Sequence, residues 1–173
     1  MQTDSSLPVD TRAQSWNKWL LFVVLAGVVL ILDQITKQYI HATFGLYESR
    51  PVWESFFHLT YVRNSGAAFG FLSWLDPKFL KIFFLSVTGV AMIVLLIYYA
   101  RVPRAQTLTL WGLALIAGGA LGNGVDRLWI GQVIDFIDIH VSGYHWPAFN
   151  VADSAICIGV GFLLIDSFRS PSS

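Results

Sequence analysis

Five aspartates of this chain lie at or near the same ends of its long apolar segments. They are Asp33, Asp126, Asp135, Asp138 and Asp153. A carboxylate in or near hydrocarbon costs free energy, so it usually persists because it serves a function. Two carboxyls held close together cannot both ionise easily, and one of them can keep a proton near neutral pH. Such a pair can activate one water molecule: one carboxyl takes a proton and the other donates one to the leaving group. The pattern favours aspartic hydrolysis at one membrane face, and only Asp166 falls near the opposite face.

The motifs of other hydrolytic or cofactor-dependent sites are absent from the sequence. There is no HExxH, and no two of the histidines at 41, 58, 140 and 145 are four residues apart, as a helical zinc site requires. A GxSxG nucleophile motif and a P-loop are also missing. Since Cys157 is the single cysteine, no internal disulfide can form. We therefore expect neither a metal nor another cofactor.

The composition is that of a membrane protein. Of the 173 residues, 55% are hydrophobic and 13% are charged, and the mean hydropathy is +0.59. Soluble domains carry about 25% charged residues. The formal net charge is zero, so we expect no nucleic-acid partner.

Four apolar segments are long enough to cross a bilayer. They lie at about residues 19–40, 81–100, 107–124 and 148–168, each close to the roughly 20 residues that span about 30 Å of hydrocarbon. The first could instead be a signal peptide, but no small-x-small cleavage site follows it, so we expect a retained span. Residues 1–15 are polar and predict a disordered tail, and residues 16–173 predict one four-helix domain.

Four spans put both termini on one side of the membrane. Five basic residues fall on the side of the termini and six on the other side, so a raw count does not orient the chain. The five lie in shorter segments, and this density favours cytoplasmic termini. Connections 41–80 and 125–147 are then outside. Because residues 52–62 (VWESFFHLTYV) are rich in aromatic and β-branched residues, they predict a strand. We expect an all-α membrane protein, a four-helix bundle with a small extracytoplasmic β-element.

Two motifs in the first half of the chain have an ordinary structural interpretation beside a functional one. In DQITK, Asp33 and Lys37 are four residues apart, which alone predicts an ion pair on one helix face. Their position at the outer end of a span equally suits support of a site. In VRNSGAAFG, Asn64 and Gly66 predict a tight turn. The alternative is a substrate cleft where the backbone comes close and Asn64 makes hydrogen bonds.

The third span carries small residues and then polar ones. Gly118 and Gly122 form a GxxxG pair, which predicts close helix packing. Asn123, Asp126 and Arg127 follow at the outer end. On pattern alone the two charged residues read as interfacial, with Arg127 reaching toward the lipid headgroups.

The last two acidic motifs differ in their most direct interpretation. In VIDFID, Asp135 and Asp138 alternate with apolar residues, which on pattern alone favours a surface strand with its acids toward water. A flanked acid could instead be desolvated, with a raised pKa. In FNVADS, Asp153 lies five residues inside the expected span, about 7 Å below the polar boundary. Asn150 would share its side of the helix. A helix-terminal acid is the ordinary alternative, but the apolar residues that follow favour a functional Asp153.

Taken together, DQITK, RNSGAAFG, GGALGNGVDR, VIDF and FNVADS, in this order and spacing, resemble bacterial lipoprotein signal peptidase (signal peptidase II). The match runs from Asp33 to beyond Asp153. The resemblance implies an inner-membrane aspartic peptidase that cleaves prolipoproteins just before a diacylglyceryl-modified cysteine, with its site at the periplasmic face and both termini cytoplasmic. It also implies a catalytic pair of Asp135 and Asp153, where the residue pattern alone left Asp126 and Asp138 open.

The resemblance further implies a set of supporting or substrate-contacting residues. They are Asp33, Lys37, Asn64, Gly66, Asn123, Asp126, Arg127 and Asn150. The expected partners are the lipid-modified prolipoprotein and membrane lipid, for a monomeric enzyme. One departure is Gly124, where the family usually has a large apolar residue; it could loosen the end of the third helix.

Two functions of other classes compete with this interpretation. Intramembrane acids also occur in ion- or proton-coupled transporters and channels, but transporter sites tend to lie at the midplane of repeated halves. Here the acids cluster at one face, and no internal repeat is visible. A scaffold built on the GxxxG helix would leave the one-sided acids unexplained. Processing of a lipoprotein would distinguish the peptidase from both.

Overall fold

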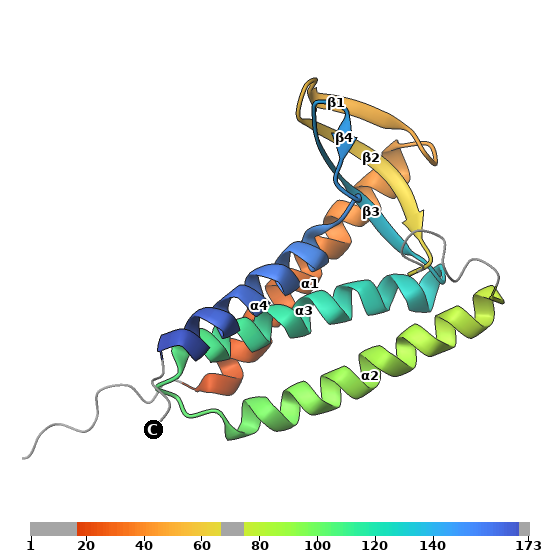
Figure 1. Cartoon of the computed structure of the whole chain (residues 1–173). Helices are drawn as coiled ribbons and strands as arrows, with labels where there is room; N and C mark the ends of the chain where they lie inside the picture. The colour runs from red at the N-terminus through yellow and green to blue at the C-terminus, as the bar shows by residue number, and fades with distance from the viewer. Residues whose placement is uncertain (1–16, 67–74, 170–173) are drawn as a thin grey trace, which may run out of the picture.

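The computed structural model describes residues 17–66 and 75–169 (Figure 1). The predicted N-terminal tail and residues 67–70 of the NSGAAFG motif lie outside the described residues.

Four helices in this part of the chain are long and apolar enough to cross a membrane. They are α1 (Lys18–Thr43), α2 (Pro77–Arg101), α3 (Thr107–Trp129) and α4 (Val151–Arg169). The predicted four-helix membrane architecture is confirmed, while four helix ends differ from the sequence-based bounds by three to five residues. One of them is the end of α1, at Thr43 and not at residue 40.

Local capping and pairing explain the shifted helix ends. Helix α2 begins four residues early because Asp76 accepts hydrogen bonds from the N–H groups of Lys78 and Phe79 (2.8 and 3.2 Å). Helix α3 continues through Gly124 to Trp129, so the loosening expected at Gly124 is not seen. Helix α4 begins three residues late because Phe149 pairs its backbone with Ile137.

Helix α3 lies at the centre of the bundle and packs against α1, α2 and α4. Its small residues allow this close contact, as the GxxxG pattern predicted. A Cβ atom at Gly118 would lie 2.7 Å from the Cβ of Val29 on α1. A Cβ atom at Gly122 would lie 2.5 Å from Oδ2 of Asp33, also on α1. Any larger side chain at either position would push α1 away.

A four-stranded antiparallel sheet stands at one end of the bundle, here named the outer end (Figure 1). Its order is β1 (Ser49–Trp53), β2 (Phe57–Asn64), β3 (Val133–Val141) and β4 (Tyr144–His145). The prediction of one strand over residues 52–62 is wrong, because the chain turns between Trp53 and Phe57. Glu54 and Ser55 occupy this turn, and both residue types favour turns over strands.

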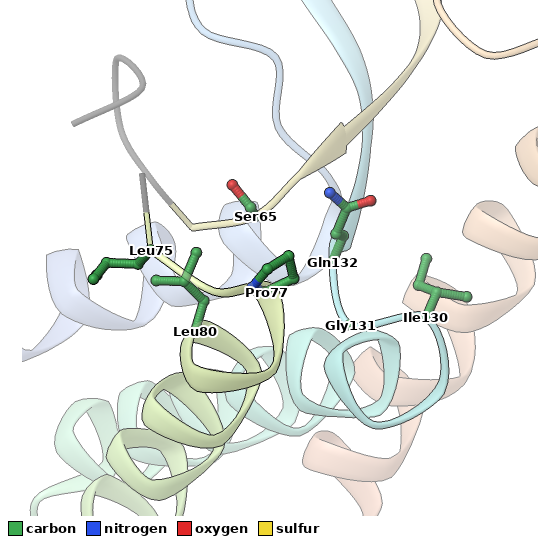
Figure 2. Close-up of a pocket in the computed structure, with 7 residues that line it drawn as sticks. All are labelled: Ser65, Leu75, Pro77, Leu80, Ile130, Gly131 and Gln132. Carbon is green, nitrogen blue, oxygen red and sulfur yellow. The ribbon is translucent and has the colours of Figure 1, made fainter. Parts of the chain in front are cut away.

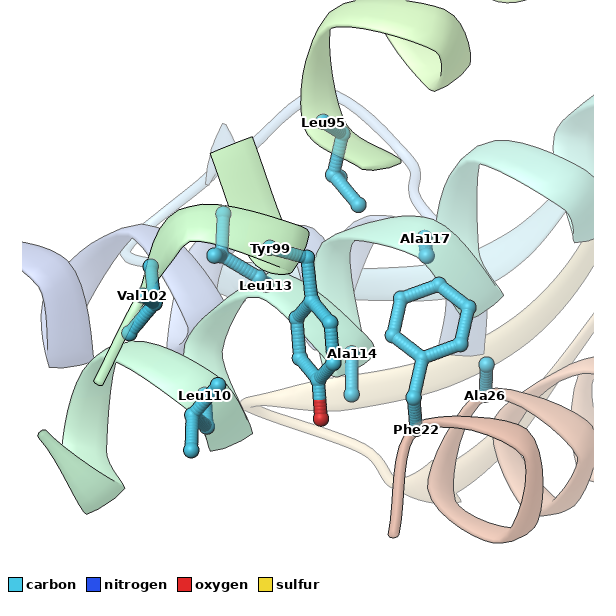
Figure 3. Packing of buried hydrophobic residues seen from close by; sticks show 9 residues of the cluster. All are labelled: Phe22, Ala26, Leu95, Tyr99, Val102, Leu110, Leu113, Ala114 and Ala117. Carbon is cyan, nitrogen blue, oxygen red and sulfur yellow. The ribbon is translucent and has the colours of Figure 1, made fainter. Parts of the chain in front are cut away.

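The two ends of the bundle have separate apolar cores. At the inner end, away from the sheet, the cluster of Figure 3 joins α1, α2 and α3 around the buried ring of Tyr99, whose hydroxyl donates to the carbonyl of Lys18 (2.5 Å). At the outer end, Ile40 of α1 and Phe44, which follows the helix, pack with Tyr61, Ile134 and Phe136 of the sheet. This second core fixes β3 on the end of α1.

Candidate active site

Asp135 is a buried residue of strand β3. Its side chain is 2% exposed. The side-chain amide of Asn64, on β2, donates to Oδ2 at 2.9 Å, and that of Asn150 donates to Oδ1 at 2.7 Å. The interpretation of residues 133–138 as a strand with acids toward water is therefore wrong for Asp135. Its neighbours Ile134 and Phe136 belong to the core under the sheet, which holds this part of β3 away from solvent.

Burial raises the pKa of Asp135 to about 6, and the nearby charge of Asp153 adds to the increase. Hydrogen bonds from Asn64 and Asn150 act in the opposite direction, because they stabilise the carboxylate. Asp135 can therefore hold a proton at a pH where an exposed aspartate has lost it.

Asp153 is the third residue of α4 and takes part in its N-terminal cap. Its N–H donates to Oδ1 of Asn150 at 2.9 Å, while its Oδ2 accepts from the N–H of Asn150 at 3.3 Å. This reciprocal pair is a capping box. Because the helix starts at Val151, Asp153 lies in the first turn and not five residues into a helix. The positive end of the helix dipole favours a negative charge there.

Two asparagine amides join the acids of β3 and α4 into one network. Asn123, on α3, donates to Oδ1 of Asp153 at 2.8 Å. Asn150 donates to Oδ1 of Asn123 at 3.2 Å as well as to Asp135. The network brings together one strand and two helices, and it leaves Asp135 and Asp153 as its two carboxyls.

A buried ion cluster lies behind this network. The ammonium of Lys37 is fully buried and contacts Oδ2 of Asp33 at 2.8 Å, Oδ2 of Asp126 at 2.9 Å and Oδ1 of Asn123 at 2.8 Å. The Asp33–Lys37 pair is thus not a surface ion pair. Asp33 also accepts the N–H of Ala152 on α4, and Asp126 accepts the N–H of Ile134 on β3. The cluster therefore holds the backbone beside both acids of the network.

Arg127 and Gly66 lie at the edge of the site. The guanidinium of Arg127 donates to the carbonyl of Asn123 at 3.3 Å and lies 4.9 Å from the ring centroid of Phe84. The N–H of Gly66 donates to Oδ1 of Asn64 at 2.8 Å, which orients the Asn64 amide toward Asp135. Gly66 has a φ of +86°, and a Cβ atom there would lie 2.5 Å from the Phe84 ring. Glycine is required at this position on both counts.

The two acids that the residue pattern left open have other partners. Asp126 contacts Lys37 and accepts the N–H of Ile134. Asp138 contacts Nδ1 of His145 at 2.9 Å. Asp138 is three positions after Asp135 along β3, an odd spacing, so the two side chains point to opposite faces of the sheet.

Sequence reasoning missed two residues of this site. Gln34 donates to Oδ1 of Asp126 (3.0 Å) and the carbonyl of Gly122 (3.1 Å), so it bridges α1 and α3. Its place directly after Asp33 was the available signal. Phe84 lies between Gly66 and Arg127, and one phenylalanine in an apolar span gives no signal of its own.

A cavity of about 450 Å³ opens beside the end of β2 (Figure 2). Residues from the end of β2, the start of α2 and the α3–β3 connection line it. They are Ser65, Leu75, Pro77, Leu80, Ile130, Gly131 and Gln132. In residues 17–66 and 75–169, no group of three or more His, Cys, Asp or Glu side chains has the geometry of a metal site.

Comparison with known proteins gives one consistent result. The family described as signal peptidase (SPase) II matches residues 14–169. The lipoprotein signal peptidase of Syntrophus aciditrophicus is 50% identical over 150 residues, which cover 87% of this chain and 93% of that protein. The lipoprotein signal peptidase of Geobacter metallireducens is 46% identical over 149 residues, covering 86% and 91%.

Two solved structures of bacterial membrane enzymes share the fold. One, at 2.3 Å resolution, has a TM-score of 0.76 and 35% identity and covers 86% of this chain and 88% of that chain. The other, at 1.9 Å, has a TM-score of 0.77 and 33% identity and covers 87% and 94%. At these identities the likeness extends to the sequence as well as to the arrangement of helices.

Proposed function

The chain belongs to the signal peptidase II family, and from this premise we propose that Asp135 and Asp153 cleave the signal peptide from diacylglyceryl-modified prolipoproteins, just before the lipidated cysteine. The observation that carries the assignment is the amide network, in which Asn123 and Asn150 connect these two carboxyls at one end of four membrane helices.

The two acids have different roles in the reaction: one donates a proton and the other accepts one. Asp135, whose pKa is raised to about 6 by burial, carries the proton that the pair shares. Asp153, in the first turn of α4, accepts a proton from the attacking water as its oxygen adds to the peptide carbonyl. Asp135 donates its proton to the carbonyl oxygen. When the tetrahedral intermediate collapses, the C–N bond breaks and the proton on Asp153 passes to the departing amine of the lipidated cysteine. One hydroxyl proton of the intermediate returns to Asp135 as the new carboxyl group forms, which restores the starting state of the pair.

The supporting residues position this pair. Asn64, Asn123 and Asn150 hold the carboxyl oxygens in place. Asp33, Lys37 and Asp126 fix the backbone of α4 and β3 on the bundle. Gly66 and Arg127 lie at the edge of the site, where they can meet the substrate.

The site's position suits this substrate. Acyl chains keep the modified cysteine at the membrane surface, so its scissile bond lies near the interface, at the level of the acids. We place the enzyme in the bacterial inner membrane, with the site and sheet at the periplasmic face and both termini in the cytoplasm. It acts as a monomer surrounded by membrane lipid, from which the lipidated substrate enters.

The test uses purified enzyme in lipid and a diacylglyceryl-modified prolipoprotein, with signal-peptide release followed on a gel. Asp135→Asn and Asp153→Asn each lower the rate by at least about 10³-fold, because a single carboxyl cannot both accept and donate the proton. Asp138→Asn is the matched control, since Asp138 lies on the same strand outside the network, and it keeps the wild-type rate within about twofold. Near wild-type cleavage by Asp135→Asn or Asp153→Asn would refute the pair.

A further inference from the structure

The inner end of the bundle holds a polar pocket, about 230 Å³ in volume, at the opposite end from the catalytic acids. It is lined by Tyr98, Gln106, Thr109, Leu163, Asp166 and Ser167. The hydroxyl of Thr109, on α3, donates to Oδ2 of Asp166, on α4, at 2.5 Å. The pocket thus contains one carboxylate among neutral polar and apolar side chains.

In the part of the chain that the structure describes, no lysine, arginine or histidine nitrogen lies within 4.0 Å of the Asp166 carboxylate. The neighbouring cations contact other groups or are exposed. Lys18 donates to the carbonyls of Tyr99 (3.1 Å), Ala100 (2.9 Å) and Val102 (2.9 Å), where it caps the end of α2. Arg101, Arg104 and Arg169 are exposed to the surroundings. A partly buried negative charge is therefore available to a cation from outside the described chain.

The pocket and the active site share one face of α3. Thr109 and Arg127 are 18 residues apart, which is five helical turns, so they lie on the same side of α3, about 27 Å apart. Helices α2 and α4 flank this face. At its outer end lie Phe84 of α2 and Asp153 of α4, and at its inner end lie Tyr98 of α2 and Asp166 of α4.

Within the described residues, no Cα atom of α2 lies within 8 Å of a Cα atom of α4, whereas both helices pack on α3. Figure 1 shows the inner ends of α2, α3 and α4 at the end of the bundle away from the sheet. The face of α3 between α2 and α4 can therefore guide an extended or helical chain from the catalytic acids to Asp166.

The length and charge of a signal peptide match the spacing between Asp153 and Asp166. A signal peptide has a basic n-region followed by an apolar h-region of about 7–15 residues. As a helix, such an h-region spans about 10–22 Å. The 13 residues from Asp153 to Asp166 rise about 20 Å along α4. A signal peptide cleaved beside Asp153 therefore brings its n-region to the depth of Asp166.

We propose that the pocket around Asp166 binds a lysine or arginine of the signal peptide's n-region. This inference rests on the proposed function. The ammonium or guanidinium pairs with the free oxygen of Asp166, and Gln106 and Ser167 offer further acceptors. The pocket thus selects substrates at the cytoplasmic side, far from the bond that is cleaved.

The experiment compares two lipidated substrates, one with lysines in its n-region and one with those lysines replaced by glutamine. Asp166→Asn lowers kcat/KM for the lysine substrate about fivefold, the value of a partly exposed ion pair, and leaves the glutamine substrate unchanged. The loss appears in KM, because the n-region does not touch the reacting atoms. The Asp166→Lys variant enlarges the loss for the lysine substrate by repulsion.

The matched control is Asp138→Asn, the same carboxylate-to-amide change at a residue that contacts His145 and lines neither the pocket nor the acid network. It should keep kcat/KM for both substrates within about twofold. If Asp166→Asn slows both substrates equally, Asp166 only ties two helices together through Thr109 and the binding site is overturned. That outcome leaves the proposed function intact. Failure of the wild-type enzyme to cleave either substrate would instead overturn that function and this site with it.

Discussion

At the scale of single residues, Asp135 shows how one position balances opposing effects. Burial favours its neutral form, while the Asn64 amide, 2.9 Å away, favours the carboxylate. The proposed catalytic pair needs one shared proton. Below the pKa of Asp135 this proton is retained, and above it the proton is lost and the rate falls. The alkaline limb of the pH–rate profile should therefore lie near pH 6.

Asn64→Ala tests this balance. Without the Asn64 hydrogen bond the carboxylate of Asp135 loses stabilisation, so its pKa rises further and the alkaline limb moves upward by about one pH unit. The measurement is kcat/KM between pH 4.5 and 9 on one substrate. Ser65→Ala is the control, because Ser65 lines the neighbouring cavity without a hydrogen bond to Asp135. A downward shift, or the same shift in Ser65→Ala, would contradict the role of Asn64.

The residue types and their order could be predicted from the sequence, but several of their contacts could not. The sequence pattern favoured a surface position for Asp135, because the alternation of polar and apolar residues along a strand does not show which face of the sheet is buried. The core of Ile40, Phe44 and Tyr61 decides this, and it comes from distant segments. The sequence predicted a single ion pair between Lys37 and Asp33, because the second partner of Lys37, Asp126, lies on another helix.

At the scale of the helices, the contact between α3 and α4 determines where Asp153 lies. A Cβ atom at Gly119 would overlap the carbonyl oxygen of Ala152, which immediately precedes Asp153. Gly119→Ala should therefore displace the start of α4 and lower kcat by about 10²-fold, the usual cost of a 1 Å misplacement. Activity of the purified variant and its thermal unfolding temperature are the measurements.

Gly124→Ala is the matched control on the same helix. A Cβ atom at Gly124 would lie 3.6 Å from Cγ2 of Thr88, an ordinary contact. Alanine also favours helix by up to about 1 kcal/mol over glycine, so this variant should keep its activity and unfold at the same or a higher temperature. Equal losses in both variants would show that the α3–α4 contact does not position Asp153.

Span lengths and order were predictable because hydrocarbon thickness sets them, whereas helix ends were not. Asp76 and Asn150 determine two of those ends through side-chain caps. Asn150 both caps α4 and donates a hydrogen bond to Asp135. The apolar segment predicted a span that began before Asn150, because residue composition does not show that Phe149 pairs with Ile137 of β3.

At the scale of the whole molecule, the structure changes the charge count that orients the chain. The sequence placed six basic residues outside and five inside. Lys37 is fully buried between two carboxylates, and Arg127 lies half-buried against Phe84. Neither is a solvated loop charge of the kind that retains a segment in the cytoplasm. When every buried or half-buried cation is left out, Arg50 and Lys78 are the exposed outer charges of the described residues. The exposed inner charges are Arg101, Arg104 and Arg169, so the count agrees with the density in favouring cytoplasmic termini.

Single cysteines in a Cys157→Ser background test this orientation. Ser55→Cys lies in the exposed turn between β1 and β2, and Ala105→Cys in the exposed connection between α2 and α3, so both should leave cleavage unchanged. In cells with a permeabilised outer membrane, an impermeant maleimide should label Ser55→Cys at once and Ala105→Cys only after the inner membrane is disrupted. The reverse pattern would put the proposed catalytic acids in the cytoplasm. Diacylglyceryl-modified substrate bonds at the outer leaflet would then lie a full bilayer, about 30 Å, from Asp135 and Asp153.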